Sequence, residues 1–242
     1  MVKWMCLTVV AVVLTAILPS LAQDSLPPQR VEITAPDGLK LIADLTFPSD
    51  VGESGVPAVV LIHMYGSTRQ SWKSLIPALT EAGCAALAVD LRGHGETGGR
   101  ADWKVTGDDV LVCLDWLRQQ DGIDPAKISV IGASIGANLA LRTMAADEAI
   151  VTVIALSPSL NLYDLATEDA VKQTQRPIFL AVAQNDGPAG DVKTLAGWIK
   201  GEGLVRYYKG SRHGVSLLVL PDLIPTMVFW LNIYNHPERF AE

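Results

Sequence analysis

The sequence lacks several patterns that would place it in a common class of binding protein. Its 242 residues contain no internal repeat, low-complexity segment, glycine-rich phosphate loop, dinucleotide fingerprint or clustered metal ligands. We therefore expect neither a cofactor nor a metal ion. Basic residues are also few, since 19 Lys and Arg against 26 Asp and Glu give a net charge of −7. This balance argues against nucleic acid or an anionic membrane surface as the main partner.

Cysteine is rare, with three in the chain. Cys6 lies in the N-terminal segment described below, which leaves Cys84 and Cys113. Cys84 falls at a predicted helix-to-strand turn, and Cys113 lies on the apolar stripe of a predicted helix. We expect two buried thiols rather than a disulfide, although an oxidising compartment would permit one.

The first 22 residues have the pattern of a secretory signal peptide. Lys3 is the only charge, the segment from Met5 to Leu18 is apolar, and Ser20-Leu21-Ala22 supplies small residues at a cleavage site. The apolar run is too short to span a bilayer comfortably. An uncleaved anchor or a buried N-terminal helix are the alternatives. We predict that residues 1–22 are removed and that residues 23–242 are exported without stable membrane insertion.

Residues 128–144 organise the rest of the chain. Ile128-Ser129-Val130-Ile131 indicates a buried strand, Gly132-Ala133-Ser134-Ile135-Gly136 is a G-x-S-x-G motif, and residues 137–144 are good helix formers. A serine on such a turn projects its Oγ beside the N-terminus of the helix, where N–H groups favour developing negative charge. The alternative is a serine that only caps the helix. We predict that Ser134 is a nucleophile.

The remaining pattern alternates strands with helices. The strands are expected over residues 31–34, 39–47, 58–62, 85–90, 128–131, 150–156, 178–183 and 204–208, and the helices over 72–79, 108–121, 137–144, 162–172, 192–199 and 224–234. The turn at residues 35–38 predicts an opening hairpin. Such alternation predicts one α/β domain, with a mostly parallel eight-stranded sheet and helices on both faces. In these sheets ligands bind at the carboxyl ends of the strands.

Chemically active residues follow those strand ends. They are His63-Met64-Tyr65-Gly66-Ser67, Asp90-Leu91-Arg92-Gly93-His94-Gly95, Ser134, Gln184-Asn185-Asp186-Gly187 and His213-Gly214. Over residues 30–235 this order resembles the α/β-hydrolase superfamily, in its compact branch of esterases and dienelactone hydrolases. The resemblance implies the α/β-hydrolase fold. Residues 157–177 are too few for a cap domain, so we expect an open cleft.

The resemblance also implies roles for individual residues. Ser134, Asp186 and His213 would form a catalytic triad in the order that the fold requires. The backbone N–H groups of Ile135 and Tyr65 would form the oxyanion hole. Met64 stands where the family more commonly has glycine, which makes the donor from Tyr65 the less secure of the two.

Several residues compete with these assignments. Asp164 follows the sixth predicted strand and is an alternative acid, whereas Asp191 is better explained as a helix-capping residue. We interpret His94, Arg92 and Glu96 as structural residues of their loop. The aromatic residues Trp72, Trp103 and Tyr65 either line the cleft or pack beneath it.

These features together predict a serine hydrolase that cleaves small carboxylic esters or thioesters through an acyl-enzyme. Hydrolysis of a peptide or amide by the same triad is one alternative. A secreted binding protein on a retained hydrolase scaffold is another, which the complete Ser, Asp and His set argues against.

Overall fold

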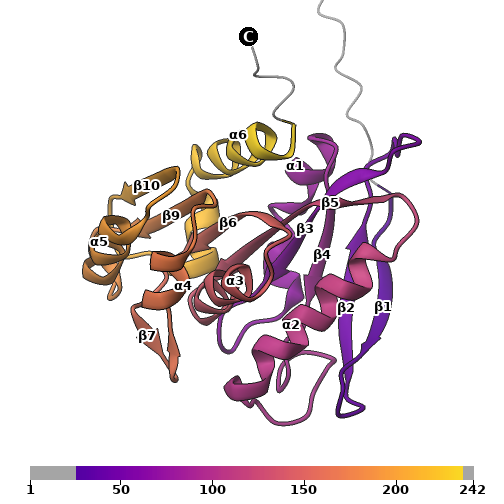
Figure 1. Cartoon of the computed structure of the whole chain (residues 1–242), viewed down its shortest axis with the longest axis horizontal. Coiled ribbons are helices and arrows are strands. Elements are labelled where there is room, and N and C mark those ends of the chain that lie inside the picture. The colour runs from indigo at the N-terminus through magenta and orange to yellow at the C-terminus, as the bar shows by residue number, and fades with distance from the viewer. Residues whose placement is uncertain (1–25, 237–242) are drawn as a thin grey trace, which may run out of the picture.

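A computed structural model describes residues 26–236, so the predicted signal peptide lies outside the described residues. The strands of the main sheet are β1 (Gln29–Thr34), β2 (Lys40–Thr46), β3 (Val56–Ile62), β4 (Ala85–Val89), β5 (Ile123–Ala133), β6 (Ile150–Leu156), β9 (Ile178–Ala183) and β10 (Gly203–Tyr208). Their order is β1-β2-β4-β3-β5-β6-β9-β10 (Figure 1). Strand β2 runs antiparallel to both of its neighbours, and every other pair is parallel. The predicted eight-stranded, mostly parallel sheet with an opening hairpin is confirmed.

Helices cover both faces of this sheet, as predicted. One face packs against α2 (Trp103–Arg118), α3 (Ile135–Ala146), α4 (Glu168–Gln173) and α5 (Ala189–Trp198), and the other against α1 (Ile76–Glu81) and α6 (Leu223–Asn235). Figure 1 shows α1 and α6 together at one side of the sheet. Successive strand residues alternate between the two cores: Val60 and Ile62 face α2 and α3, whereas Val59 and Leu61 face α1 and α6.

The cysteines lie in these two separate cores. Cys113 on α2 belongs to one core cluster and Cys84 to the cluster on the opposite face of the sheet. Both thiols are buried, and no disulfide joins them. The prediction of two buried thiols is confirmed.

Three predicted helices differ most from the observed ones, while α3, α5 and α6 agree with the prediction to within three residues. The helix expected over residues 72–79 is split into a 3₁₀ turn (Arg69–Trp72) and α1, because Pro77 fits best in the first turn of a helix. Helix α2 begins at Trp103 instead of residue 108, because the Asp102 side chain caps it by accepting the N–H of Lys104 at 3.1 Å.

The third difference lies between β6 and β9. The sequence predicts a helix over residues 162–172, but the first part of this range forms a hairpin of β7 (Asn161–Leu162) and β8 (Leu165–Ala166). Only residues from Glu168 onward are helical. Within residues 26–236, none of the helices is both long enough and apolar enough to span a membrane.

Candidate active site

Ser134 lies on a sharp turn between β5 and α3. Its φ of 52° is a left-handed value that serine rarely adopts, so the backbone is strained there. A Cβ atom at Gly132 would overlap the carbonyl oxygen of Gly136, and one at Gly136 would overlap the carbonyl oxygen of Ile62. The two glycines of the motif are therefore required for the chain to turn this tightly.

The Ser134 side chain does not cap the helix that it begins. Its backbone does not have the extended conformation of an ordinary N-cap residue, and its hydroxyl makes no cap hydrogen bond. The alternative interpretation of Ser134 as a mere helix cap is therefore wrong. Its hydroxyl lies at the N-terminus of α3, whose macrodipole favours negative charge.

Asp186 and His213 come together from the ends of β9 and β10. Both carboxylate oxygens of Asp186 lie near Nδ1 of His213, at 2.9 and 3.0 Å. An ionised carboxylate can only accept, so Nδ1 of His213 carries a proton, and in the neutral form of the ring Nε2 has the lone pair. The side chain of Asp186 is 7% exposed and that of His213 is 38% exposed. The acid is thus shielded while part of the imidazole faces the surface.

Ser157 is a member of this network that the sequence did not reveal. It is the first residue after β6, and its φ is 55°. Its Oγ donates to Oδ2 of Asp186 at 2.6 Å and accepts the N–H of Gly214 at 3.0 Å. The hydroxyl therefore ties the acid to the loop that carries His213. The one available signal was its position directly after a predicted strand.

The His213 loop packs against the residue that precedes Ser134. A Cβ atom at Gly214 would lie 3.5 Å from Cβ of Ala133 and 3.0 Å from Sδ of Met64. No hydrogen bond joins Ser134 to His213 among the described residues. Hydrogen bonds of this kind often tighten only when substrate binds.

The two predicted oxyanion donors come from the start of α3 and from the loop after β3. Ile135 is the first residue of α3, so its N–H has no acceptor within the helix. Tyr65 lies in a turn closed by the N–H of Ser67, which donates to the carbonyl of Met64 at 3.1 Å. The positive φ in this loop falls on Gly66 and not on Met64. Methionine in place of the more common glycine therefore introduces no backbone strain.

His63 anchors the loop that carries Tyr65. Its Nδ1 lies 2.8 Å from the carbonyl of Met64, and its Nε2 accepts the N–H of Leu91 at 3.0 Å. These partners require the neutral ring, with the proton on Nδ1. Burial lowers the pKa of His63 to about 4, and the nearby ring of His94 contributes in the same direction. His63 is a neutral structural residue between two strand ends.

Asp90 organises the loop after β4. It is fully buried and accepts the backbone N–H groups of Arg69 at 2.7 Å and Glu96 at 2.8 Å, together with the Arg69 guanidinium. A Cβ atom at Gly95 would overlap its carboxylate. Glu96 also binds Arg69 through its side chain. These contacts fit the structural role predicted for Glu96.

Arg92 and His94 belong to the same loop. Arg92 makes two hydrogen bonds of 2.8 Å to Asp109 and a third of 2.5 Å to Asp37. These bonds, those to Asp109 first, raise the pKa of Arg92. Nδ1 of His94 lies 3.0 Å from the carbonyl of Arg92. The contacts of Arg92 are structural, as predicted for it.

The two competing carboxylates lie elsewhere. Asp164 is at the tip of the β7–β8 hairpin. Asp191, in the first turn of α5, accepts the N–H of Leu160 at 3.0 Å. Asp191 thus holds the hairpin segment instead of capping the helix, which Pro188 precedes. Within the described part of the chain, no group of three His, Cys, Asp or Glu side chains could hold a metal ion.

The sequence is similar to a known protein family over most of its length. A family model described as "Alpha/beta hydrolase family" matches residues 59–239. The uncharacterized protein Rv2307c of Mycobacterium tuberculosis (strain H37Rv) is 34% identical over 121 residues, covering 50% of this chain and 42% of that protein. Thiohydrolase aneE of Aspergillus aculeatus is 30% identical over 137 residues, covering 53% and 41%. The chain thus spans less than half the length of these relatives.

Solved structures extend the likeness to most of the chain. The Pyrococcus furiosus esterase Pf2001 superimposes with a TM-score of 0.74 over 86% of this chain and 93% of its own. The sequence identity is 22%, so this likeness concerns the fold.

Proposed function

The chain belongs to the α/β-hydrolase family, and on this premise we propose that it is a serine hydrolase cleaving carboxylic esters or thioesters. The observation that carries the proposal is the pairing of Asp186 with His213 at the sheet edge that presents Ser134 on a strained turn. An orienting acid, a base and a hydroxyl are the three parts that an activated serine needs.

In the proposed reaction, Ser134 Oγ attacks the carbonyl carbon of the substrate while Nε2 of His213 takes its proton. Asp186 holds the proton on Nδ1 and stabilises the imidazolium that forms. His213 then protonates the leaving alcohol or thiol, which leaves an acyl group on Ser134. A water molecule, deprotonated by the same imidazole, releases the acid and restores the serine.

The negative charge on the attacked carbonyl oxygen needs two donors. The N–H of Ile135 is one, supported by its place at the start of α3, and the N–H of Tyr65 is the other. Each such donor contributes about 3 kcal/mol to the transition state. Ser157 acts as a positioning residue, because its hydroxyl touches Asp186 and the His213 loop, not the reacting atoms.

Two features support esters and thioesters as the substrate class. The segment between β6 and β9 holds only the β7–β8 hairpin and the short α4, so this segment forms no cap domain over the proposed cleft. The matching Aspergillus protein is called a thiohydrolase, which makes thioesters a class to include in the proposal.

A substrate screen tests the proposal. Purified protein should hydrolyse p-nitrophenyl acetate and a phenyl thioacetate, whereas the matched p-nitroanilide should be turned over far more slowly. Replacing the nucleophile in Ser134→Ala should lower kcat by at least about 10⁴, as for other serine triads. Ester turnover that survives in folded Ser134→Ala would contradict the mechanism. Turnover confined to the anilide would favour the amide alternative.

A further inference from the structure

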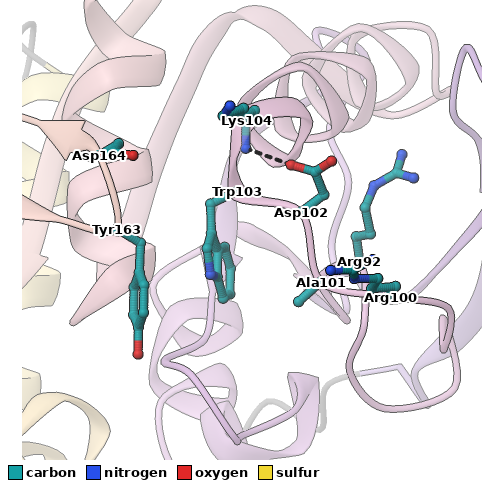
Figure 2. Close-up of a pocket in the computed structure, with 8 residues that line it drawn as sticks. All are labelled: Arg92, Arg100, Ala101, Asp102, Trp103, Lys104, Tyr163 and Asp164. Atoms are coloured by element: carbon teal, nitrogen blue, oxygen red, sulfur yellow. Dashed lines mark hydrogen bonds between the residues drawn. The ribbon is translucent and has the colours of Figure 1, made fainter.

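An aromatic cluster lies beside the proposed active site. It consists of Tyr65, His94, Trp103 and Tyr163, which come from the loops after β3 and β4, the start of α2 and the tip of the β7–β8 hairpin. The ring centroid of Tyr65 lies 6.0 Å from the centroid of Trp103 and 6.0 Å from that of Tyr163. The centroids of Trp103 and Tyr163 are 5.9 Å apart. Figure 2 shows the last two rings side by side.

Two rings of this cluster are exposed. Tyr65 is 57% and Tyr163 is 56% exposed, whereas Trp72, which the sequence offered as a possible cleft residue, is fully buried. An aromatic ring usually contributes most when it is buried. Packing of the protein core therefore does not explain why these rings gather at this surface.

The backbone at Tyr163 is strained. Its φ is 50°, and the next residue, Asp164, has a φ of 65°. Glycine or asparagine would adopt this left-handed turn at lower cost than a bulky tyrosine. Strain of this kind in a bulky residue points to a role beyond the turn itself.

The cluster borders the nucleophile through the loop after β3. The carbonyl oxygen of His63 would lie 2.6 Å from a Cβ atom at Gly136, and Met64 reaches the His213 loop at Gly214. Tyr65 is the next residue, so its ring connects the proposed oxyanion hole to Trp103 and Tyr163.

A cavity of about 660 Å³ adjoins the rings of Trp103 and Tyr163. That volume is within the usual range for a small-molecule site. Apart from Trp103, Tyr163 and Ala101, the lining is charged (Figure 2), formed by Arg92, Arg100, Asp102, Lys104 and Asp164. An alkyl chain here would desolvate charged groups without replacing their hydrogen bonds. A flat ring with polar substituents would meet both the aromatic faces and the polar wall.

We propose that the aromatic cluster is a subsite for an aromatic ring in the acyl or alcohol part of the ester substrate. This inference rests on the proposed hydrolase function and names the substrate class of the same site. Edge-to-face and offset contacts with Tyr65, Trp103 and Tyr163 would favour an aromatic ring over a saturated ring of similar size.

Matched esters test the subsite. Benzyl acetate is compared with cyclohexylmethyl acetate, and methyl phenylacetate with methyl cyclohexylacetate. In at least one pair, kcat/KM should be about fivefold higher for the aromatic ester. The variant Tyr163→Asn removes a ring but suits a φ of 50°, so it should fold at least as stably as the wild type. Its aromatic preference should fall toward one.

Tyr207→Thr is the matched control, since Tyr207 is another exposed tyrosine, 43% exposed on β10, outside the cluster. Its preference should equal that of the wild type. No aromatic preference in either pair, or a preference unchanged in Tyr163→Asn, would overturn the subsite while leaving the hydrolase proposal standing.

Turnover of none of the four esters would count against the hydrolase proposal, and the subsite is then judged by binding alone. Phenylacetate should bind about fivefold more tightly than cyclohexylacetate in NMR titrations, and only when Tyr163 is present. Equal binding of the two carboxylates would overturn the subsite.

Discussion

At the scale of single residues, the contacts of Asp186 distinguish it from the other two candidate acids. It accepts from His213 and from Ser157, while Asp164 lies at a hairpin tip and Asp191 binds a backbone N–H. Asp186→Asn should therefore lower kcat by about 10⁴, as loss of the orienting acid does in serine proteases, with thermal stability largely kept.

Asp164→Asn is the matched control for that change. Asparagine tolerates the φ of 65° at this position, so the variant should fold and lose far less activity than Asp186→Asn. Turnover and thermal unfolding of both variants make the comparison. A collapsed rate in folded Asp164→Asn beside a normal rate in Asp186→Asn would move the acid to the hairpin.

Ser157 offers a second test at this scale. Ser157→Gly removes the hydroxyl and relieves the strain at a φ of 55°, whereas Ser157→Ala removes the hydroxyl and keeps the strain. Both should lower kcat about tenfold at unchanged KM, because one hydrogen bond to a charged group is lost.

The rate should be normalised to active sites titrated with a phosphonate. A merely structural residue would change the number of active sites and the stability but not the rate per site. Normal turnover per site in both variants would remove Ser157 from the catalytic network.

The sequence predicted part of this network and missed part. The sequence alone is enough to recognise the motif around Ser134 and the positions of Asp186 and His213 after predicted strands. The spacing of residues and their order along the chain carry this information. Ser157 has no motif, and its bond to Asp186 joins residues 29 apart in the chain. Such a contact depends on the register of β6 and β9, which no local pattern encodes.

At the scale of elements, the turn between β5 and α3 depends on close backbone contact. A methyl group at Gly136 would overlap the carbonyl oxygen of Ile62, and backbone cannot move aside as a flexible side chain can. Gly136→Ala should lower the free energy of unfolding by about 3 kcal/mol and abolish turnover.

Gly107→Ala provides the contrast, since Gly107 lies inside α2 with open space at its Cβ position. That variant should gain about 0.5–1 kcal/mol, because alanine favours the helix. Urea unfolding measures both changes. Comparable stability for the two variants would mean that the turn is not as tightly constrained as described.

Most strands of the main sheet were predicted to within two residues, although β5 begins at Ile123 and not at residue 128. Buried strands such as β3 and β9 are continuous apolar runs whose ends coincide with polar loops. Helix α2 instead begins at Trp103, directly after the Asp102 cap and about two turns before its apolar stripe. The β7–β8 hairpin has only two residues in each strand, too short for any periodicity to register.

At the scale of the whole molecule, buried His63 links stability to pH. Its pKa is about 4 in the folded protein because of burial, against an ordinary value of 6.5. As pH falls below 6.5 the unfolded chain takes up a proton that folded His63 does not accept until about pH 4. Stability should therefore fall by about 3 kcal/mol across this window and be fully present above it.

Urea unfolding between pH 7 and pH 4 checks this dependence. Asp37 and Glu96 have pKa values lowered by hydrogen bonds to Arg92 and Arg69, respectively. Their contribution to stability is lost only below their ordinary pKa values of 3.8 and 4.5, outside the interval from pH 6.5 to 5. His63→Asn keeps one donor and one acceptor and should be less stable but nearly independent of pH between 6.5 and 5. A wild-type stability that is constant over that interval would contradict a neutral, buried His63.

The central claim is that Ser134 is a nucleophile activated by His213 and Asp186. The most direct measurement is mass spectrometry of the folded protein after reaction with a fluorophosphonate, with peptides mapped to locate the adduct. The account predicts one adduct on the peptide that contains Ser134, absent in Ser134→Ala and formed much more slowly in His213→Ala. Modification of a different serine, no adduct on folded protein, or equal labelling of His213→Ala would contradict it.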